Sequence, residues 1–175
     1  SIDAQVTSAQ TNEVTPYYLQ MRLPDERSDE FALLRPFVPY SSADRSPRKQ
    51  LTAFMVARSD PGRYGRLEVF EMSEGRSKGE LVANRNVAGP LAAHEAMVSD
   101  TKSRFTEQLT LLNGRGGGSR ATLGNMVMVP VGRSLLYVRP VYVAGDAEGS
   151  ANPLRLVVVW VNGQVAVGDT LDDAL

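Results

Sequence analysis

Apolar and polar residues alternate along much of the chain, and this pattern predicts β-strands. In residues 17–23 (YYLQMRL), Tyr17, Leu19 and Met21 share one face and the residues between them share the other. This is the period of a half-buried strand. Comparable apolar runs occupy residues 31–38, 51–59, 66–72, 121–131, 134–143, 154–161 and 164–168. We therefore expect about eight strands.

Short turns separate several of these runs. Pro61-Gly62, Gly132-Arg133 and Asn162-Gly163 each stand between two apolar segments. Asn-Gly in such a place is the strongest short-range signal of a β-hairpin. Links this short make consecutive strands antiparallel neighbours.

The hydrophobic period changes at Pro90. Apolar positions and a histidine then follow at steps of three and four, the stripe of an amphipathic helix: Leu91, His94, Val98, Thr101, Phe105, Leu109 and Leu112. Ser99-Asp100 can break this helix into two by capping the second part. The glycine-rich stretch 113–120 (NGRGGGSR) ends it.

These elements predict an α+β fold. We expect a mainly antiparallel, curved β-sheet or partly open barrel of about eight strands, with one helical insertion. Residues 1–15 lack an apolar period and are predicted to be a flexible lead-in, and residues 16–175 a single soluble domain. The chain starts at Ser1, and Thr170 begins a helix close to its end. Both features predict a domain excised from a longer protein.

Composition excludes several functional classes. Lys and Arg number 19 and Asp and Glu 20, so no bulk positive field attracts nucleic acid, and we predict no nucleic-acid partner. The absence of cysteine excludes disulfides, zinc–thiolate sites and thiol catalysis. No apolar run approaches the ~20 residues that span a bilayer. We also find no cofactor fingerprint and predict neither a cofactor nor a metal site.

An Arg-Pro pair interrupts two of the apolar runs, at Arg35-Pro36 and Arg139-Pro140. Proline cannot donate to a sheet ladder, so Pro36 and Pro140 are predicted at edges or bulges. Each arginine can lay its stem along apolar surface and keep its guanidinium in water. Alternatively, Arg35 and Arg139 form rim contacts and converge on an anion, which a guanidinium binds through two hydrogen bonds.

The glycine-rich stretch is a second candidate anion site, formed by Arg115, Gly116, Gly117, Gly118 and Arg120. It differs from a P-loop, because it follows a helix and leads into a strand. The alternative interpretation is a flexible loop that ends the helix.

No residue stands out as catalytic. His94 is the single histidine, and its place on the apolar stripe favours a partly buried structural role. Acid–base chemistry would need a pair of carboxylates, and the candidates are Asp25, Glu26, Asp29, Glu30, Glu68, Glu71 and Glu95. Their density in loops and on polar strand faces instead indicates a solvated surface.

Six blocks of sequence together resemble a known family. They are PYYLQMRLP, FALLRPFVPY, LTAFMVARSDPGRYGRLEVFEM, TEQLTLLN, GNMVMVPVGRSLLYVRPVYV and TLDDAL. In this order they are similar to the soluble part of uncharacterised protein family 0182, which comprises large bacterial membrane proteins. The resemblance implies several preceding transmembrane helices and a soluble segment at the membrane surface. It supplies no catalytic residues.

We therefore expect a binding or interaction module of an uncharacterised integral membrane protein. The parent protein would lie in the cell membrane through its transmembrane segments, with this domain on the extracytoplasmic side. Its partner would be another protein or a ligand of the cell envelope. The alternative is an enzyme that acts on cell-envelope material through paired carboxylates.

Overall fold

The computed structural model describes residues 16–23, 26–41, 46–47, 49–72, 87–114, 120–132, 134–144 and 152–175. The predicted lead-in, residues 1–15, lies outside these ranges. The chain forms two compact units. The first unit consists mainly of residues 3–92 and 129–135, and the second unit of residues 93–128 and 136–175.

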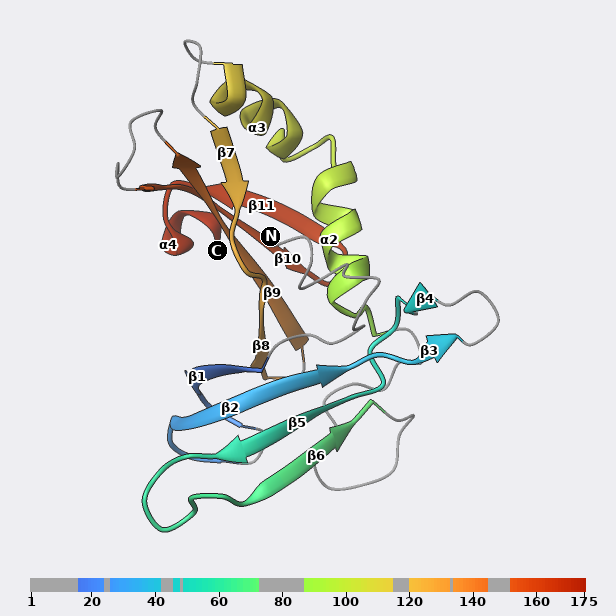
Figure 1. Ribbon diagram of the computed structural model, residues 1–175, viewed down its shortest axis with the longest axis vertical. Helices are drawn as coiled ribbons and strands as arrows, with labels where there is room; N and C mark the ends of the chain where they lie inside the picture. The colour runs from blue at the N-terminus through green and yellow to red at the C-terminus, as the bar shows by residue number, and fades with distance from the viewer. Residues whose placement is uncertain are drawn as a thin grey trace. The chain divides into compact units, whose positions relative to one another are not determined.

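The first unit contains a four-stranded antiparallel sheet (Figure 1). Its strands, in spatial order, are β1 (Tyr17–Met21), β2 (Glu30–Phe37), β5 (Ala53–Arg58) and β6 (Leu67–Glu71). Two short strands, β3 (Tyr40–Ser41) and β4 (Ser46–Pro47), pair with each other. The predicted hairpin around Pro61-Gly62 is confirmed, because β5 pairs antiparallel with β6.

One face of this sheet is buried. Ala32 and Leu34 of β2 and Phe54 and Val56 of β5 have exposed fractions of 0%. These positions alternate along each strand with less buried ones, as a pleated strand requires. We call the buried face the inward face and the opposite one the outward face.

The other large antiparallel sheet lies mainly in the second unit. Its strands, in spatial order, are β11 (Gln164–Gly168), β10 (Leu154–Val161), β9 (Ser134–Ala144) and β7 (Arg120–Leu123), and β8 (Val127–Val131) also pairs with β9. The predicted Asn-Gly hairpin between β10 and β11 is confirmed: Asn162 and Gly163 have φ values of 49° and 84°, and Val161 pairs with Gln164.

The predicted strand 121–131 is interrupted, so that β7 and β8 are separate strands. The interruption starts at Gly124, which lies very close to β9. A Cβ atom at Gly124 would stand 2.6 Å from Cγ of Pro140 and 2.7 Å from Cε2 of Tyr142. Only glycine permits this approach.

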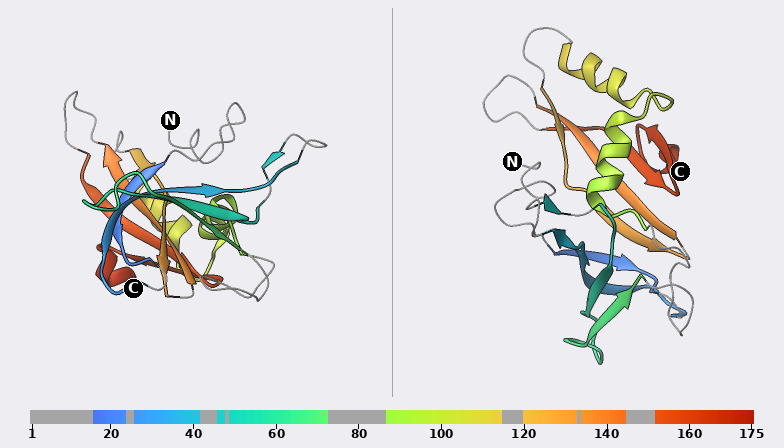
Figure 2. Two further views of the ribbon diagram at one scale, coloured as in Figure 1. Left: turned by 90° about the horizontal axis from the view of Figure 1, so that it is seen from below. Right: turned by 90° about the vertical axis from the view of Figure 1, so that its right-hand side faces the viewer.

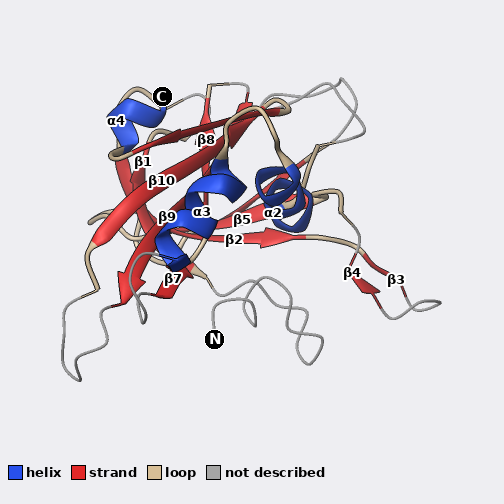
Figure 3. Ribbon diagram, turned by 90° about the horizontal axis from the view of Figure 1, so that it is seen from above, coloured by secondary structure: helices blue, strands red, loops and turns tan. Residues whose placement is uncertain are grey.

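Three helices occur in the described residues: α2 (Pro90–Ser99), α3 (Phe105–Gly114) and α4 (Leu171–Ala174) (Figure 3). The predicted break at Ser99-Asp100 is confirmed, and Figure 2 shows α2 and α3 as separate helices. Asp100 accepts a hydrogen bond from the Ser103 backbone N–H at 2.6 Å, and this bond lowers the pKa of its carboxyl group. Asp100 thus caps the turn between the two helices, and α3 begins at Phe105.

Both faces of β10 are covered at its centre, because Val157, Val158 and Val159 are all buried. Val157 and Val159 pack with Ala174 of α4. The opposite face carries Val158 and its cross-strand neighbour Arg139. Arg139 in turn contacts α2, as described below.

The α+β class and the mainly antiparallel sheet are therefore confirmed. The strands divide between two main sheets, and no closed barrel is formed by the described residues.

Candidate interaction face and ionic cluster

The outward face of the first sheet is apolar across all four strands. The strand register aligns Tyr18, Leu33, Ala57 and Leu67 in one row. The adjacent row contains Arg35, Met55 and Val69. Directly opposed residues on neighbouring strands project from the same face, so the two rows form one continuous surface.

Several large side chains on this outward face are open to solvent. Their exposed fractions are 61% for Tyr18, 46% for Phe31, 62% for Leu67 and 54% for Val69. An antiparallel sheet with one solvated face normally carries polar residues there. A contiguous exposed apolar patch on a folded unit instead marks a site of interaction.

Part of this surface is ordered by its own contacts. The rings of Tyr18 and Phe31 stack with centroids 5.2 Å apart and planes inclined by 10°. The Arg35 guanidinium lies 5.5 Å from the centroid of the Phe37 ring. These contacts restrict the side chains before any partner arrives, which lowers the entropy that binding would cost.

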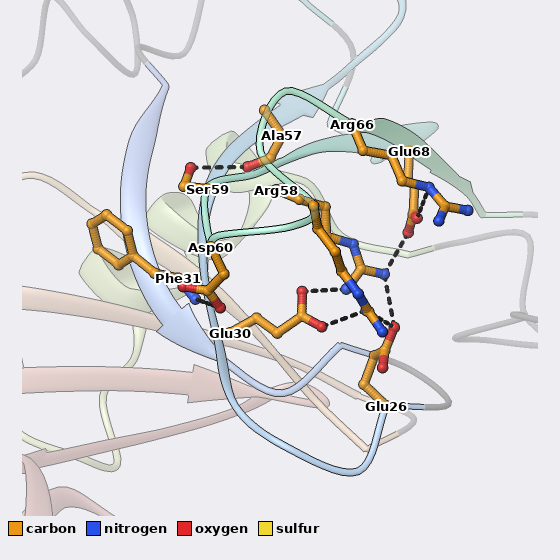
Figure 4. Close-up of polar contacts among 10 residues, drawn as sticks. Glu26, Glu30, Phe31, Ala57, Arg58, Ser59, Asp60, Arg66 and Glu68 are labelled. Atoms are coloured by element: carbon orange, nitrogen blue, oxygen red, sulfur yellow. Dashed lines mark hydrogen bonds and ion pairs between the residues drawn. The ribbon is translucent and has the colours of Figure 1, made fainter.

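A cluster of ion pairs lies at the end of the sheet near the β5–β6 turn (Figure 4). Arg58, at the end of β5, is only 5% exposed and forms its centre. Its Nη2 lies 3.0 Å from Oε1 of Glu26 and 2.7 Å from Oε2 of Glu68, and its Nη1 donates to Glu30. The three glutamates come from the segment before β2, from β2 itself and from β6.

Arg63 ties the turn to the same cluster. Its Nη1 lies 2.7 Å from Oε1 of Glu26 and 2.6 Å from Oε1 of Glu30. Backbone bonds close the turn as well, because Gly65 N–H donates to the Arg58 carbonyl oxygen at 2.9 Å. Side-chain and backbone contacts together fix the hairpin relative to β2.

Contacts within the cluster shift the pKa values of Glu26 and Arg58. The hydrogen bond from Arg63 is the main cause that holds the pKa of Glu26 below its ordinary value of 4.5. Burial opposes this shift, and the hydrogen bond from Arg58 adds to it. Burial alone would lower the pKa of Arg58, but its hydrogen bonds to Glu68 and Glu30 raise that pKa above its ordinary value.

The structure thus brings together three of the seven candidate carboxylates, Glu26, Glu30 and Glu68. Each contacts a guanidinium group. A general acid at neutral pH needs a raised pKa, whereas the pKa of Glu26 is lowered. The geometry therefore favours a structural role for the cluster over acid–base catalysis.

Arg139 lies in the interior of the second unit. It is 1% exposed, so the interpretation that its guanidinium lies in water is wrong. Its Nη1 lies 2.5 Å from Nδ1 of His94. A guanidinium only donates, so His94 Nδ1 is the acceptor. His94 is partly buried on α2 and thereby connects the helix to β9, which agrees with a structural role.

The surroundings of Pro140 explain the Arg-Pro sequence. Gly124 N–H donates to the Pro140 carbonyl oxygen at 2.7 Å. In a regular antiparallel pair the partner would return an N–H to Gly124, but proline has none. Arg139 Nε donates to the Gly124 carbonyl oxygen at 3.1 Å instead. The Arg139 side chain therefore takes the place of the backbone N–H that Pro140 lacks.

The sequence predicts Pro140 at an edge or a bulge. The edge position is wrong, because β9 lies between β10 and β7 and Pro140 pairs with Val157. A register shift does interrupt the β9–β10 ladder nearby, between Leu154 and Leu156. The arginine donor makes the interior position tolerable.

Pro36 does occupy an edge position within the described residues. Ser59 N–H donates to the Phe31 carbonyl oxygen, so alternate residues of β2 from Phe31 onward direct their backbone groups toward β5. Pro36 falls between them and directs its nitrogen to the β1 side. The β1 ladder ends at the Tyr17–Leu34 pair, before it reaches Pro36.

The remaining predicted site residues do not form a described site. Arg115, Gly116, Gly117 and Gly118 lie outside the described residues. Arg120 is exposed at the start of β7, and Arg35 is half-buried in β2. Anion binding by the glycine-rich loop, or by Arg35 with Arg139, stays a prediction.

In the part of the chain that the structure describes, no three His, Asp or Glu side chains gather in the manner of metal ligands. None of the described helices combines the length and the apolar character that crossing a bilayer requires.

Sequence reasoning missed the outward face and the central role of Arg58. A signal for the face was present in β2, whose run FALL places apolar residues at consecutive positions and hence on both faces. No comparable signal identified Arg58, because its glutamate partners are distant in sequence.

Comparison with known proteins identifies relatives along the whole chain. The model of "Uncharacterised protein family (UPF0182)" matches residues 3–112. A UPF0182 protein of Trichodesmium erythraeum is 33% identical over 174 residues, which is 99% of this chain and 15% of the relative. One from Moorella thermoacetica is 33% identical over 175 residues, which is 100% of this chain and 17% of the relative.

The chain therefore spans only 15% to 17% of the length of these two relatives. No solved structure matches it. Because the family model covers more than half of its residues, the chain belongs to the uncharacterised protein family UPF0182.

Proposed function

We propose that this chain is an extracytoplasmic interaction module of a multi-pass membrane protein, and that its outward face is covered by a polypeptide partner. The single observation that carries the proposed role is the exposed apolar surface formed by Tyr18, Phe31, Leu67 and Val69. The membrane attachment follows from what the family resemblance implies.

The chemistry of the surface supports a binding role. Exposed apolar area is unfavourable by about 25 cal/mol per Å² relative to its burial. Aromatic side chains such as Tyr18 and Phe31 are enriched at the centres of interfaces, because they bury a large area and lose few rotamers. Their mutual stacking presents a preformed contact surface.

The covering of the outward face can be measured with a thiol reagent, because these 175 residues contain no cysteine and any cysteine elsewhere in the full-length protein can be replaced by serine. Leu67→Cys and Leu111→Cys form a matched pair, since Leu67 is 62% exposed on the outward face and Leu111 is 61% exposed on α3. In the isolated chain both thiols should react with a maleimide at similar rates.

In the full-length protein in membranes, we expect Leu67→Cys to react at least roughly tenfold more slowly than in the isolated chain, because a buried thiol is inaccessible to the reagent. Leu111→Cys should keep its rate. Equal reactivity of Leu67→Cys in both forms would exclude a covered face.

The proposed side of the membrane has a separate test. Tyr64 lies in the β5–β6 turn and is 82% exposed, so Tyr64→Cys offers an accessible thiol. A membrane-impermeant maleimide should label it in intact cells. Labelling only after permeabilisation would place the domain on the cytoplasmic side and contradict this part of the proposal.

A further inference from the structure

We propose that the partner covering the outward face is another segment of the same polypeptide. This inference rests on the proposed function, since it requires that the face is covered. The segment that covers the outward face is an apolar stripe of a helix or an apolar strand face, and it comes from the part of the protein beyond these 175 residues.

The relatives contain far more chain outside this region than within it. The two relatives compared above devote only 15% and 17% of their length to the matching segment. A tethered segment acts at an effective concentration that reaches the millimolar range for short linkers. It therefore competes strongly against a separate protein or a second copy of the chain.

The charge of the outward face disfavours a lipid occupant. The row that contains Arg35 is adjacent to the row in which Glu71 pairs with Ala53. The outward face thus carries opposite charges. Binding to anionic lipid requires an excess of Lys and Arg. A polypeptide needs only an apolar complement to this surface.

One row of the outward face crosses all four strands, from Tyr18 on β1 to Leu67 on β6, and the adjacent row, with Arg35, Met55 and Val69, crosses three of them. A sheet face of this kind packs against a second layer at a distance of about 10 Å. A helix or strand pair provides such a layer on the outward face, in addition to the packing that already buries the inward face.

Photo-cross-linking in the full-length protein tests the occupant. A benzoylphenylalanine replaces Val69, which is 54% exposed on the outward face, and in a matched control it replaces Leu111. Circular dichroism melting of both variants in the isolated chain establishes that each still folds. After irradiation of membranes, products are separated by mass and their joined peptides are sequenced.

Cross-links from position 69 to residues outside the 175-residue segment, on a product of monomer mass, support the inference. Cross-links to a second protein, to a second copy of dimer mass or only within the segment overturn it. If the Leu67→Cys thiol is nevertheless protected in the full-length protein, the proposed function still holds.

A protected thiol without any protein cross-link indicates a lipid occupant and also overturns the inference. An unprotected thiol without any cross-link contradicts the inference and the proposed function together.

Discussion

At the scale of single residues, Arg139 and Pro140 act together. Arg139 donates to Gly124 in place of the N–H that Pro140 lacks, and it also donates to His94. Arg139→Met should therefore destabilise the second unit by roughly 1 to 3 kcal/mol for each buried acceptor left without this donor. Urea unfolding measures the loss, and the single tryptophan, Trp160 in β10, reports on this unit.

The double substitution provides a sharper test. Pro140→Ala restores a backbone N–H directed at Gly124, so in the Arg139→Met background it should recover about 1 kcal/mol. In the unsubstituted chain the same change should bring no comparable gain, because Arg139 already occupies the acceptor. Strictly additive effects of the two substitutions would contradict the replacement of one donor by the other.

The lowered pKa of Glu26 predicts that the stability of the fold depends on pH. The folded-state pKa of this carboxyl group is lowered mainly by Arg63. Such a group stabilises the fold above its unfolded-state pKa, and this contribution is lost as the pH falls toward the lower folded-state pKa. Glu26→Gln should therefore be less stable than the unsubstituted chain at pH 7, and the difference should shrink below the ordinary pKa of 4.5.

Circular dichroism melting across this pH range measures the effect. In an Arg63→Gln background the difference should be smaller at every pH, because the main cause of the shift is removed. A difference that grows on acidification would refute the assignment.

At the scale of elements, Gly168 determines how closely α4 packs on β11. A Cβ atom there would stand 2.6 Å from Cβ of Asp173 and 2.7 Å from the backbone nitrogen of Ala174. Gly168→Ala should displace α4 and cost about 1 to 3 kcal/mol, as overpacking typically does. Urea unfolding measures this loss. In a chain shortened by residues 171–175 the substitution should be nearly neutral, and an undiminished cost there would show another origin.

Elements with local signals were predictable from sequence. Asn162-Gly163 has the positive φ values that a two-residue hairpin of this type needs. Thr170 accepts from Asp173 N–H and forms a capping box at the start of α4. The interruption between β7 and β8, which starts at Gly124, was missed because its cause is a contact with Pro140, sixteen positions away. The sequence pattern does not reveal such a contact.

At the scale of the whole molecule, we expect the full-length protein to contain several apolar segments of about 20 residues, the length that spans a bilayer. The basis is the family resemblance and the short share of each relative that the chain covers. The full-length coding sequence is the measurement. Its lack of any such segment would remove the basis for membrane attachment.

The candidate site was less predictable than the class of fold. Periodicity indicated that β1 and β2 were strands, but the division of strands between two sheets depends on pairings between distant segments. The outward face emerges only when Leu67 of β6 aligns with Ala57 and Leu33. Composition alone, with its balanced charge, gave no indication of where a partner binds.

Arg139 supplies the hydrogen bond to Gly124 that Pro140 cannot donate, and this replacement constrains how the strand can evolve. A lineage can acquire the arginine first, while another residue at 140 still supplies its own N–H, and accept proline afterwards. The opposite order passes through an intermediate in which the Gly124 carbonyl lacks both donors. Once proline is fixed, loss of the arginine becomes costly. Homologues with proline at this position should therefore retain arginine before it, whereas homologues without proline should vary there more freely.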